Sequence, residues 1–162
     1  MQTTIERAES SDHWAAARRL VEEYATSLNV DLAFQDFQRE ITSLAIEYGP
    51  PRGCFLLAVQ AGAFIGCGGL RRFSDSACEM KRLYVAPGHR GEGVGRLLAE
   101  ALIGHGRRLG YETMLLDTLP TMDTAQDLYA SLGFEPAPAY RYNPVPGATF
   151  RRLTLRSIPS QE

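Results

Sequence analysis

Hydrophobic positions recur at helical spacing in the first third of the chain. They predict an amphipathic helix over 12–28, with Ser10 and Ser11 placed to cap its start. The apolar face of this helix holds Trp14, Ala17, Val21, Ala25 and Leu28. The same spacing predicts a second helix over 33–46, ended by the Gly49-Pro50-Pro51 breaker. Its apolar face holds Phe34, Phe37, Ile41, Leu44 and Ala45.

The middle of the chain changes to the two-residue period of strands. Apolar runs predict strands over 54–59, 63–70 and 78–85, and a short strand over 3–8 precedes the first helix. In the strand over 78–85, alternation predicts that Met80, Arg82 and Tyr84 share one face. Lys81, Leu83 and Val85 then share the other face. The short links between the three central strands predict an antiparallel meander.

The last third returns to helical spacing and adds two strands. A stripe from Val94 to Leu109 predicts a helix that Gly110 ends, and a strand over 113–116 follows. A helix over 121–132 and a strand over 150–155 complete the pattern. The expected fold class is therefore α+β, with a mixed, largely antiparallel central sheet flanked by about four helices.

Composition narrows the class of protein. The chain has 162 residues, which predicts one domain over 1–162, and its 44% hydrophobic and 22% charged residues are ordinary for a globular protein. The net charge of −2 predicts no nucleic-acid partner and no anionic membrane partner. The polar start, Met1–Ser11, has no signal-peptide pattern, so we expect a cytoplasmic protein.

Cysteine and histidine spacing indicates no metal site. Cys54, Cys67 and Cys78 are widely separated, form no CxxC pair and lie in or beside apolar segments, which predicts small buried side chains. The histidines show no ligand spacing, so we expect no metal.

The most informative segment is LYVAPGHRGEGVGRLL, residues 83–98. Gly91, Gly93 and Gly95 stand at the start of a predicted helix, where free N–H groups and the helix dipole favour an anion. Arg90 and Arg96 add positive charge, so the segment is typical of a phosphate-binding loop. A nucleotide-binding protein is disfavoured: no Lys follows the glycines as in a P-loop, and Arg96 stands where the dinucleotide fingerprint needs its third glycine.

Two motifs resemble the GNAT superfamily of acyl-CoA N-acyltransferases. RGEGVG, residues 90–95, is similar to the family's Q/R-x-x-G-x-G/A motif, and AQDLYASLGF, residues 125–134, is similar to its later AxxLYxxxGF helix. The order of predicted elements agrees over nearly the whole chain. Met122 stands where the family often has Asn, so no role of that Asn is transferred.

The resemblance implies acetyl-CoA as co-substrate and assigns residues to it. The backbone of Leu83 and Val85 is expected to pair with the pantetheine arm, and the Leu83 N–H to donate to the thioester oxygen, as an oxyanion hole does. The pyrophosphate is expected at the loop and the helix start. The implied acetyl-CoA-binding residues are Leu83, Val85, Arg90, Gly91, Gly93, Val94, Gly95 and Arg96.

Two side chains are candidates for proton transfer. Glu79 lies on the strand before the loop, where the family often has a base; an ion pair with Lys81 or an arginine on the sheet surface is an equally good interpretation. Tyr129 matches the family tyrosine that faces the thioester sulfur; a core position on an amphipathic helix is the alternative. Free Tyr and thiol pKa values differ by about 1.5 units, which favours a hydrogen bond to sulfur over complete transfer. Asp117 can hold an amine or serve as a helix cap or turn residue.

The sequence indicates less about the site that binds the acceptor. The loop over 140–147 carries Tyr140, Arg141 and Tyr142, which can recognise a small amine or an amino-acid carboxylate, or simply stiffen the loop. The predicted function is direct transfer of acetyl from acetyl-CoA to a primary amine, on a small molecule rather than a peptide. The alternative is a non-catalytic acyl-CoA-binding module. A late strand able to pair two subunits makes a homodimer one expected arrangement.

Overall fold

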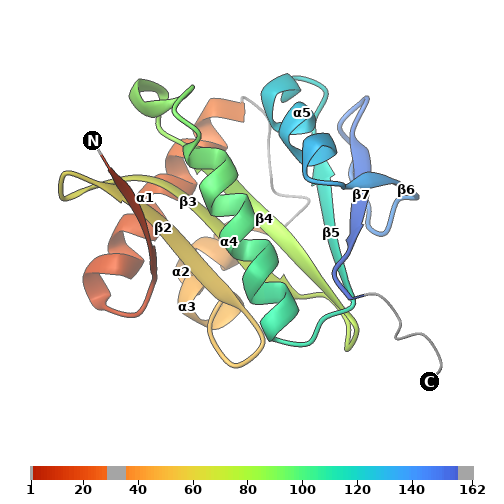
Figure 1. Ribbon diagram of the computed structural model, residues 1–162, viewed down its shortest axis with the longest axis horizontal. Coiled ribbons are helices and arrows are strands. Elements are labelled where there is room, and N and C mark those ends of the chain that lie inside the picture. Colours follow the sequence, from red (N-terminus) through yellow and green to blue (C-terminus); the bar gives the residue numbers. More distant parts are fainter. Residues whose placement is uncertain (1, 29–35, 157–162) are drawn as a thin grey trace.

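The computed structural model describes residues 2–28 and 36–156, in which seven strands form one mixed sheet (Figure 1). The strand order is β1-β2-β3-β4-β5-β7-β6, and every neighbouring pair is antiparallel except β4 and β5, which are parallel. This confirms the predicted α+β class with its largely antiparallel sheet. The strands are β1 Thr3–Arg7, β2 Cys54–Gln60, β3 Ala63–Arg72, β4 Ala77–Val85, β5 Thr113–Thr118, β6 Glu135–Ala137 and β7 Thr149–Thr154.

Helices cover both faces of the sheet, and each face has its own apolar core. One core packs α4 and α5 against the sheet through residues such as Leu98, Leu102 and Met114. The other packs α1, α2 and α3 through Leu20, Ile41 and Phe55. The helices are α1 Ser11–Leu28, α2 Phe37–Thr42, α3 Leu44–Glu47, α4 Val94–Arg108 and α5 Asp123–Ser131. No described helix is both long and apolar enough to cross a membrane.

The predicted helix over 33–46 is two short helices instead. Residues 33–35, with Phe34, lie outside the described residues; α2 and α3 follow and are separated by Ser43. The Ser43 hydroxyl donates to the Arg39 carbonyl at 2.7 Å, and its N–H donates to the Glu40 carbonyl at 3.0 Å. Serine therefore competes for the backbone bonds that would continue the helix. At the other helix start, the Ser10 hydroxyl accepts from the His13 N–H at 3.1 Å, which confirms Ser10 as a cap.

The predicted alternation along β4 is wrong from Arg82 onward. The pairing with β3 shifts register between Cys67 and Gly69, and Arg82 opposite them has a positive φ of 61°. This bulge turns Arg82 away from Met80, toward Glu40 of α2. Leu83 now packs in the same core as Met80. Two consecutive basic residues, Lys81 and Arg82, are thus buried in β4 at the bulge.

The β4 bulge lies where β4 leaves its parallel neighbour. The β4–β5 pairing runs only from Ala77 opposite Thr113 to Glu79 opposite Leu115. Beyond that pair the two strands separate, so the β5 side of β4 from Met80 to Val85 is not bonded to a strand. A strand edge of this kind has unpaired backbone groups available for a ligand.

Apart from the divided helix over 33–46, the predicted element ends were off by at most two residues, and β6 was missed. The strand predicted over 113–116 extends to Thr118, and the helix predicted over 121–132 is α5, Asp123–Ser131. The short strand β6, with Pro136 at its centre, pairs with β7 over Arg152, Arg151 and Phe150. Three residues are too few to display a two-residue period.

Candidate active site

The glycine-rich loop forms an open backbone turn at the start of α4. Gly91 and Gly93 have φ values of 82° and 81°, which L side chains rarely adopt, and a Cβ at either position would meet nothing within 4 Å. Gly93 caps α4, so the first-turn N–H groups, from Val94 to Arg96, have no helical acceptor. Open space, free N–H groups and the positive end of the helix fit a pyrophosphate.

The two loop arginines are held in different ways. The Arg90 guanidinium lies over the Tyr84 ring at 5.6 Å and its Nε donates to the Val85 carbonyl at 2.8 Å. Arg96 donates to the Ser131 hydroxyl of α5 at 2.6 Å. The Val85 carbonyl predicted to pair with pantetheine is therefore already bonded to Arg90. Arg96 is positioned by α5.

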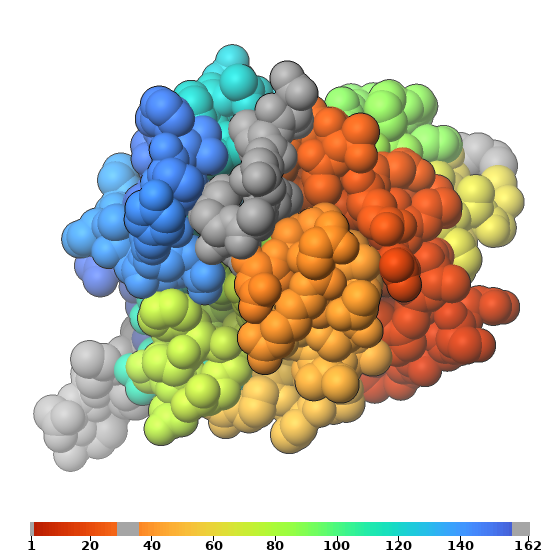
Figure 2. Space-filling view, turned by 180° about the vertical axis from the view of Figure 1, so that it is seen from behind, coloured from red at the N-terminus to blue at the C-terminus, as the bar shows by residue number. Residues whose placement is uncertain are grey.

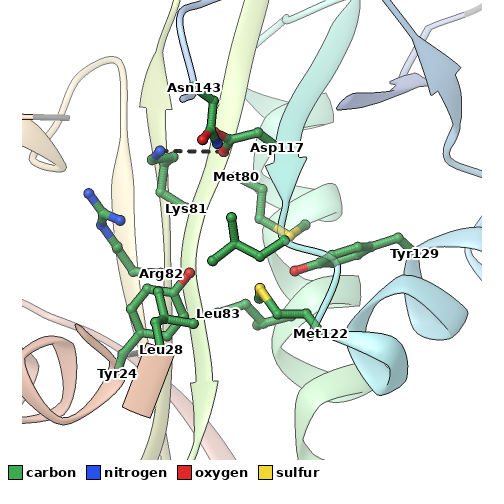
Figure 3. Close-up of a pocket in the computed structure, with 11 residues that line it drawn as sticks. Tyr24, Leu28, Met80, Lys81, Arg82, Leu83, Asp117, Met122, Tyr129 and Asn143 are labelled. Atoms are coloured by element: carbon green, nitrogen blue, oxygen red, sulfur yellow. Dashed lines mark hydrogen bonds and ion pairs between the residues drawn. The ribbon is translucent and has the colours of Figure 1, made fainter. Parts of the chain in front are cut away.

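A pocket opens where β4 and β5 separate (Figure 3). Its walls combine the β4 bulge, the end of β5, α1 and α5. Leu83 and Tyr129, two of the predicted catalytic residues, both line it, and so do the unpredicted Lys81 and Arg82. The lining residues are Tyr24, Leu28, Met80, Lys81, Arg82, Leu83, Asp117, Leu119, Met122, Tyr129 and Asn143.

Tyr129 presents its hydroxyl to this pocket from a largely buried ring. The side chain packs edge-on against Phe134, and the residue is 5% exposed (Figure 3). Burial raises the pKa of Tyr129, and Tyr24 and Asp117 raise it further. The phenol therefore stays protonated at neutral pH, which fits a hydrogen-bond donor and not a side chain that gives up its proton.

Glu79, predicted as a base or an ion-pair partner, is enclosed by hydrogen-bond donors. Oε2 accepts from the Tyr140 hydroxyl at 2.6 Å, while Oε1 accepts from Arg141 at 2.8 Å and Arg71 at 3.2 Å. Lys81 Nζ lies 3.8 Å from Oε2. The residue has no exposed surface and is not among the residues that line the pocket. Its ion pairs lie inside the molecule, not on the sheet surface.

Glu79 belongs to a chain of ion pairs on the face of the sheet that α2 and α3 cover. We call this chain the ion cluster: Glu40, Glu47, Arg71, Glu79, Lys81, Arg82, Asp117 and Arg141. Arg82 makes two bonds to Glu40, at 2.8 and 2.9 Å, and both residues are almost wholly buried. Arg82 and Arg71 lower the pKa of Glu40 although burial alone would raise it. The cluster holds four acids and four bases, so their charges balance when all are ionised.

The loop predicted to recognise the acceptor contributes to this cluster. Tyr140 and Arg141 both bond to Glu79, and the Asn143 amide donates to Asp117 at 3.0 Å. Asp117, at the end of β5, is 3.6 Å from Lys81 Nζ and lines the pocket. Figure 2 shows this side of the molecule from outside, with α1 and α2–α3 on one side and the segment from β6 to β7 on the other. The loop and these three helices thus flank one site.

Sequence reasoning missed Glu40, Lys81 and Arg82 as members of the site. Each has a signal that is visible in hindsight. Glu40 is an acid next to Ile41 on an apolar helix face, and Lys81 and Arg82 are consecutive cations in a strand that is apolar except for Glu79. Buried charges need partners of opposite charge, so contacts between these acidic and basic side chains are expected.

The three cysteines are buried free thiols, as predicted. Burial raises the pKa of Cys54 and of Cys78 to about 12, and raises that of Cys67 as well. Thiols of this kind are poor nucleophiles at neutral pH. In the part of the chain that the structure describes, no three His, Cys, Asp or Glu side chains gather as a metal site. The expectation of a metal-free protein stays a prediction.

Known proteins share both the sequence pattern and the fold. Residues 14–134 match the model of the acetyltransferase (GNAT) family. An uncharacterised N-acetyltransferase of Schizosaccharomyces pombe is 40% identical over 140 residues, which cover 85% of this chain and 86% of the yeast protein.

Solved structures agree in fold. A GNAT-family acetyltransferase from Staphylococcus aureus superposes with a TM-score of 0.79 at 18% identity, covering 96% of this chain and all of that one. A Salmonella typhimurium protein solved with its cofactor acetyl-CoA superposes with a TM-score of 0.68 at 23% identity, covering 100% and 99% of the two chains. The family match and the yeast relative show that the chain belongs to the GNAT family and is an acetyl-CoA-dependent N-acetyltransferase.

Proposed function

We propose that the protein transfers the acetyl group of acetyl-CoA directly to a primary amine of a small molecule. One observation carries the proposal: Leu83, Tyr129 and the Lys81–Asp117 pair line a single pocket where β4 and β5 separate. Acetyl-CoA supplies the activated acetyl thioester. The chain's own groups bind it, orient it and manage the protons.

The residues proposed to hold acetyl-CoA extend from β4 into α4. The free N–H groups at the start of α4 receive the pyrophosphate, with Gly91 and Gly93 leaving room for it. Arg90 and Arg96 supply compensating charge beside the loop. The unpaired edge of β4 at Leu83 and Val85 receives the pantetheine arm, which requires Arg90 to release the Val85 carbonyl.

Two groups are proposed to act on the thioester. The Leu83 N–H donates to the carbonyl oxygen, where negative charge develops as the amine adds. The Tyr129 hydroxyl donates to the sulfur, where charge develops as the thiolate leaves. The raised pKa of Tyr129 supports this donor role, since the phenol keeps its proton.

Direct transfer is favoured over an acyl-enzyme. No cysteine lines the pocket, and the raised pKa values of the three described thiols keep them protonated. Attack by the bound amine in a ternary complex needs no protein nucleophile. The recessed position of Asp117, with a side chain 7% exposed, favours a slender amine over a bulky one.

The test begins with thermal unfolding in acetyl-CoA, ATP and NAD. A ligand at 100 times its Kd stabilises the folded state by about 2.7 kcal/mol, so we expect a rise of several degrees with acetyl-CoA alone. Thiol release and amide detection by mass spectrometry are then measured with amino acids, polyamines and aromatic amines. Binding of acetyl-CoA without any acetylated amine would favour the non-catalytic acyl-CoA-binding module instead.

A further inference from the structure

One cation of the site differs in kind from every other basic side chain of the protein. Of the 17 lysines and arginines in the chain, Lys81 is the single lysine. Arginine stays protonated in proteins, whereas a buried lysine loses its proton readily. Apart from its three histidines, none of which lines the pocket, the chain therefore has one basic side chain that can exchange a proton near neutral pH, and this side chain lines the pocket.

A proton acceptor is needed because an ammonium group has no lone pair. A primary amine with a pKa near that of lysine, about 10.4, is almost entirely protonated at pH 7. Glu79, the acid expected to act as base, has its oxygens occupied by Tyr140, Arg141 and Arg71 and has no exposed surface. Its bonds suit a group that holds its neighbours in place.

We propose that Lys81 is the general base that takes the proton from the acceptor's ammonium group before the amine attacks. This inference rests on the proposed function and assigns a catalytic residue to it. The side chain is 3% exposed, lies on β4 two residues before Leu83, and has its Nζ 3.8 Å from Glu79 and 3.6 Å from Asp117 (Figure 3). A proton placed on Nζ thus lies between two carboxylates.

Some groups around Lys81 lower its pKa and others raise it. Burial lowers the pKa of Lys81 to about 8, Arg82 and Arg71 lower it further, and Glu79 and Asp117 raise it in part. From the other elements, Glu40 of α2 pairs with Arg82, and Tyr24 of α1 shares the pocket. From the loop after β6, Tyr140 and Arg141 bond to Glu79, and Asn143 bonds to Asp117.

Charge is conserved within the site during this transfer. When Lys81 is neutral, the ion cluster carries one excess negative charge, which attracts a cationic acceptor to Asp117. The ammonium proton moves to Nζ, and the freed lone pair forms the new bond to the acetyl carbon. The carbon–sulfur bond breaks, the thiolate takes the second amine proton, and Lys81 releases its proton to water before the next cycle.

The single lysine permits a direct measurement of this ionisation. Protein labelled with 13C-lysine gives one side-chain signal, which we expect to titrate near pH 8 with acetyl-CoA absent, well below the value of about 10.4 for free lysine. A titration above pH 10 would overturn the proposal. This readout requires neither an acceptor nor turnover, so it is independent of the proposed function.

Matched variants separate a base from a fixed charge. Lys81→Arg keeps the positive charge but cannot accept a proton, and Lys81→Gln has neither property. General-base loss costs about 10²- to 10⁴-fold in kcat, so we expect both variants to lose at least 100-fold and to lose the rise of kcat with pH near 8. An active Lys81→Arg variant would show that charge alone is needed and would overturn the base role.

Amines of lower basicity provide the second test. An acceptor found in the amine screen is compared with a counterpart that carries enough fluorine to lower the pKa of its ammonium group below 7. This counterpart is therefore largely neutral at pH 7. The Lys81→Gln defect is expected to shrink at least tenfold with the fluorinated amine; an equal defect with both amines would contradict the proposal. If the wild-type protein acetylates no amine while Lys81 titrates near pH 8, the proposed function fails for a reason unrelated to Lys81.

Intact-mass analysis after incubation with acetyl-CoA alone is the final check. A proton acceptor leaves the mass of the protein unchanged. Acetylation of Lys81 that accompanies turnover would make Lys81 a nucleophile and would overturn the assignment.

Discussion

The two sides of the candidate site on β4 are built from different groups. Toward α4, the site consists of backbone: glycines with positive φ, first-turn N–H groups and an unpaired strand edge. Toward α1 and α2, it consists of side chains whose charges balance across five elements and a loop. Backbone geometry suits a co-substrate that never changes, whereas a side-chain network can be rebuilt for a different acceptor.

The difference also concerns stability. The glycine-rich loop is exposed or half-buried. Its two positive-φ positions are glycines, which adopt such angles without strain. Glu40, Glu79, Lys81 and Arg82, the centre of the ion cluster, are buried, so each of these charges depends on its partner. Apart from Lys81, we therefore expect substitutions in the cluster to act mainly on folding, and substitutions at the loop to act mainly on acetyl-CoA binding.

The largest effect is expected from Glu40→Ala. It leaves Arg82 buried without its two bonds, and the loss of one partner of a buried pair costs about 3–5 kcal/mol. Urea denaturation followed by circular dichroism measures the change. The control is Glu22→Ala, which breaks an exposed pair with Arg18 and should cost at most about 1 kcal/mol. Equal losses in the two variants would contradict a structural role for the Glu40–Arg82 pair.

The next effect is expected from Tyr129→Phe and appears in turnover. Removing the hydroxyl removes a hydrogen bond to a developing thiolate, worth about 1.5–3 kcal/mol, or about 10- to 100-fold in kcat. Acetyl-CoA affinity should change little, because the ring still packs on Phe134. Tyr111→Phe is the control, since its hydroxyl bonds to the Arg52 carbonyl outside the pocket. A wild-type kcat in Tyr129→Phe would remove the tyrosine from the mechanism.

The sequence predicted the glycine turn at the start of α4 far better than the contacts of the buried charged side chains. Glycines 91, 93 and 95 lie within a few residues of one another, so their local pattern was sufficient to predict the turn that opens α4. Phosphate binding by this turn stays a prediction. The ion cluster joins Glu40 to Arg82 across 42 positions, and no local period encodes such a contact. The bulge at Arg82 further reversed the predicted faces of β4, because a one-residue irregularity transfers every later side chain to the other face.

A smaller effect is expected from Gly93→Ala, which acts on the loop. Its φ of 81° is strained for alanine by about 1–2 kcal/mol, and the methyl group points into open space where the co-substrate is proposed to bind. We expect a loss of about tenfold in acetyl-CoA affinity by calorimetry. Gly62→Ala is a matched control, because Gly62 has a φ of 79° and equally open surroundings at the β2–β3 turn. Both variants should lose similar stability, and only Gly93→Ala should lose affinity.

The smallest effect is expected on the free energy of unfolding when the pH is lowered. It again distinguishes the ion cluster from the glycine-rich loop. Arg82 holds the pKa of Glu40 below its ordinary value, so ionised Glu40 stabilises the fold above the unfolded-state pKa of about 4.3. This contribution is lost as the pH falls through the lower folded-state value, so only part of it disappears by pH 4. The free energy of unfolding of the wild type should therefore fall more steeply between pH 5 and pH 3 than that of Glu40→Gln, which has no carboxylate to protonate. Parallel slopes would show that Glu40 ionises alike in both states. The Gly93→Ala variant should retain the wild-type slope, because the loop interactions are made by backbone groups that do not titrate.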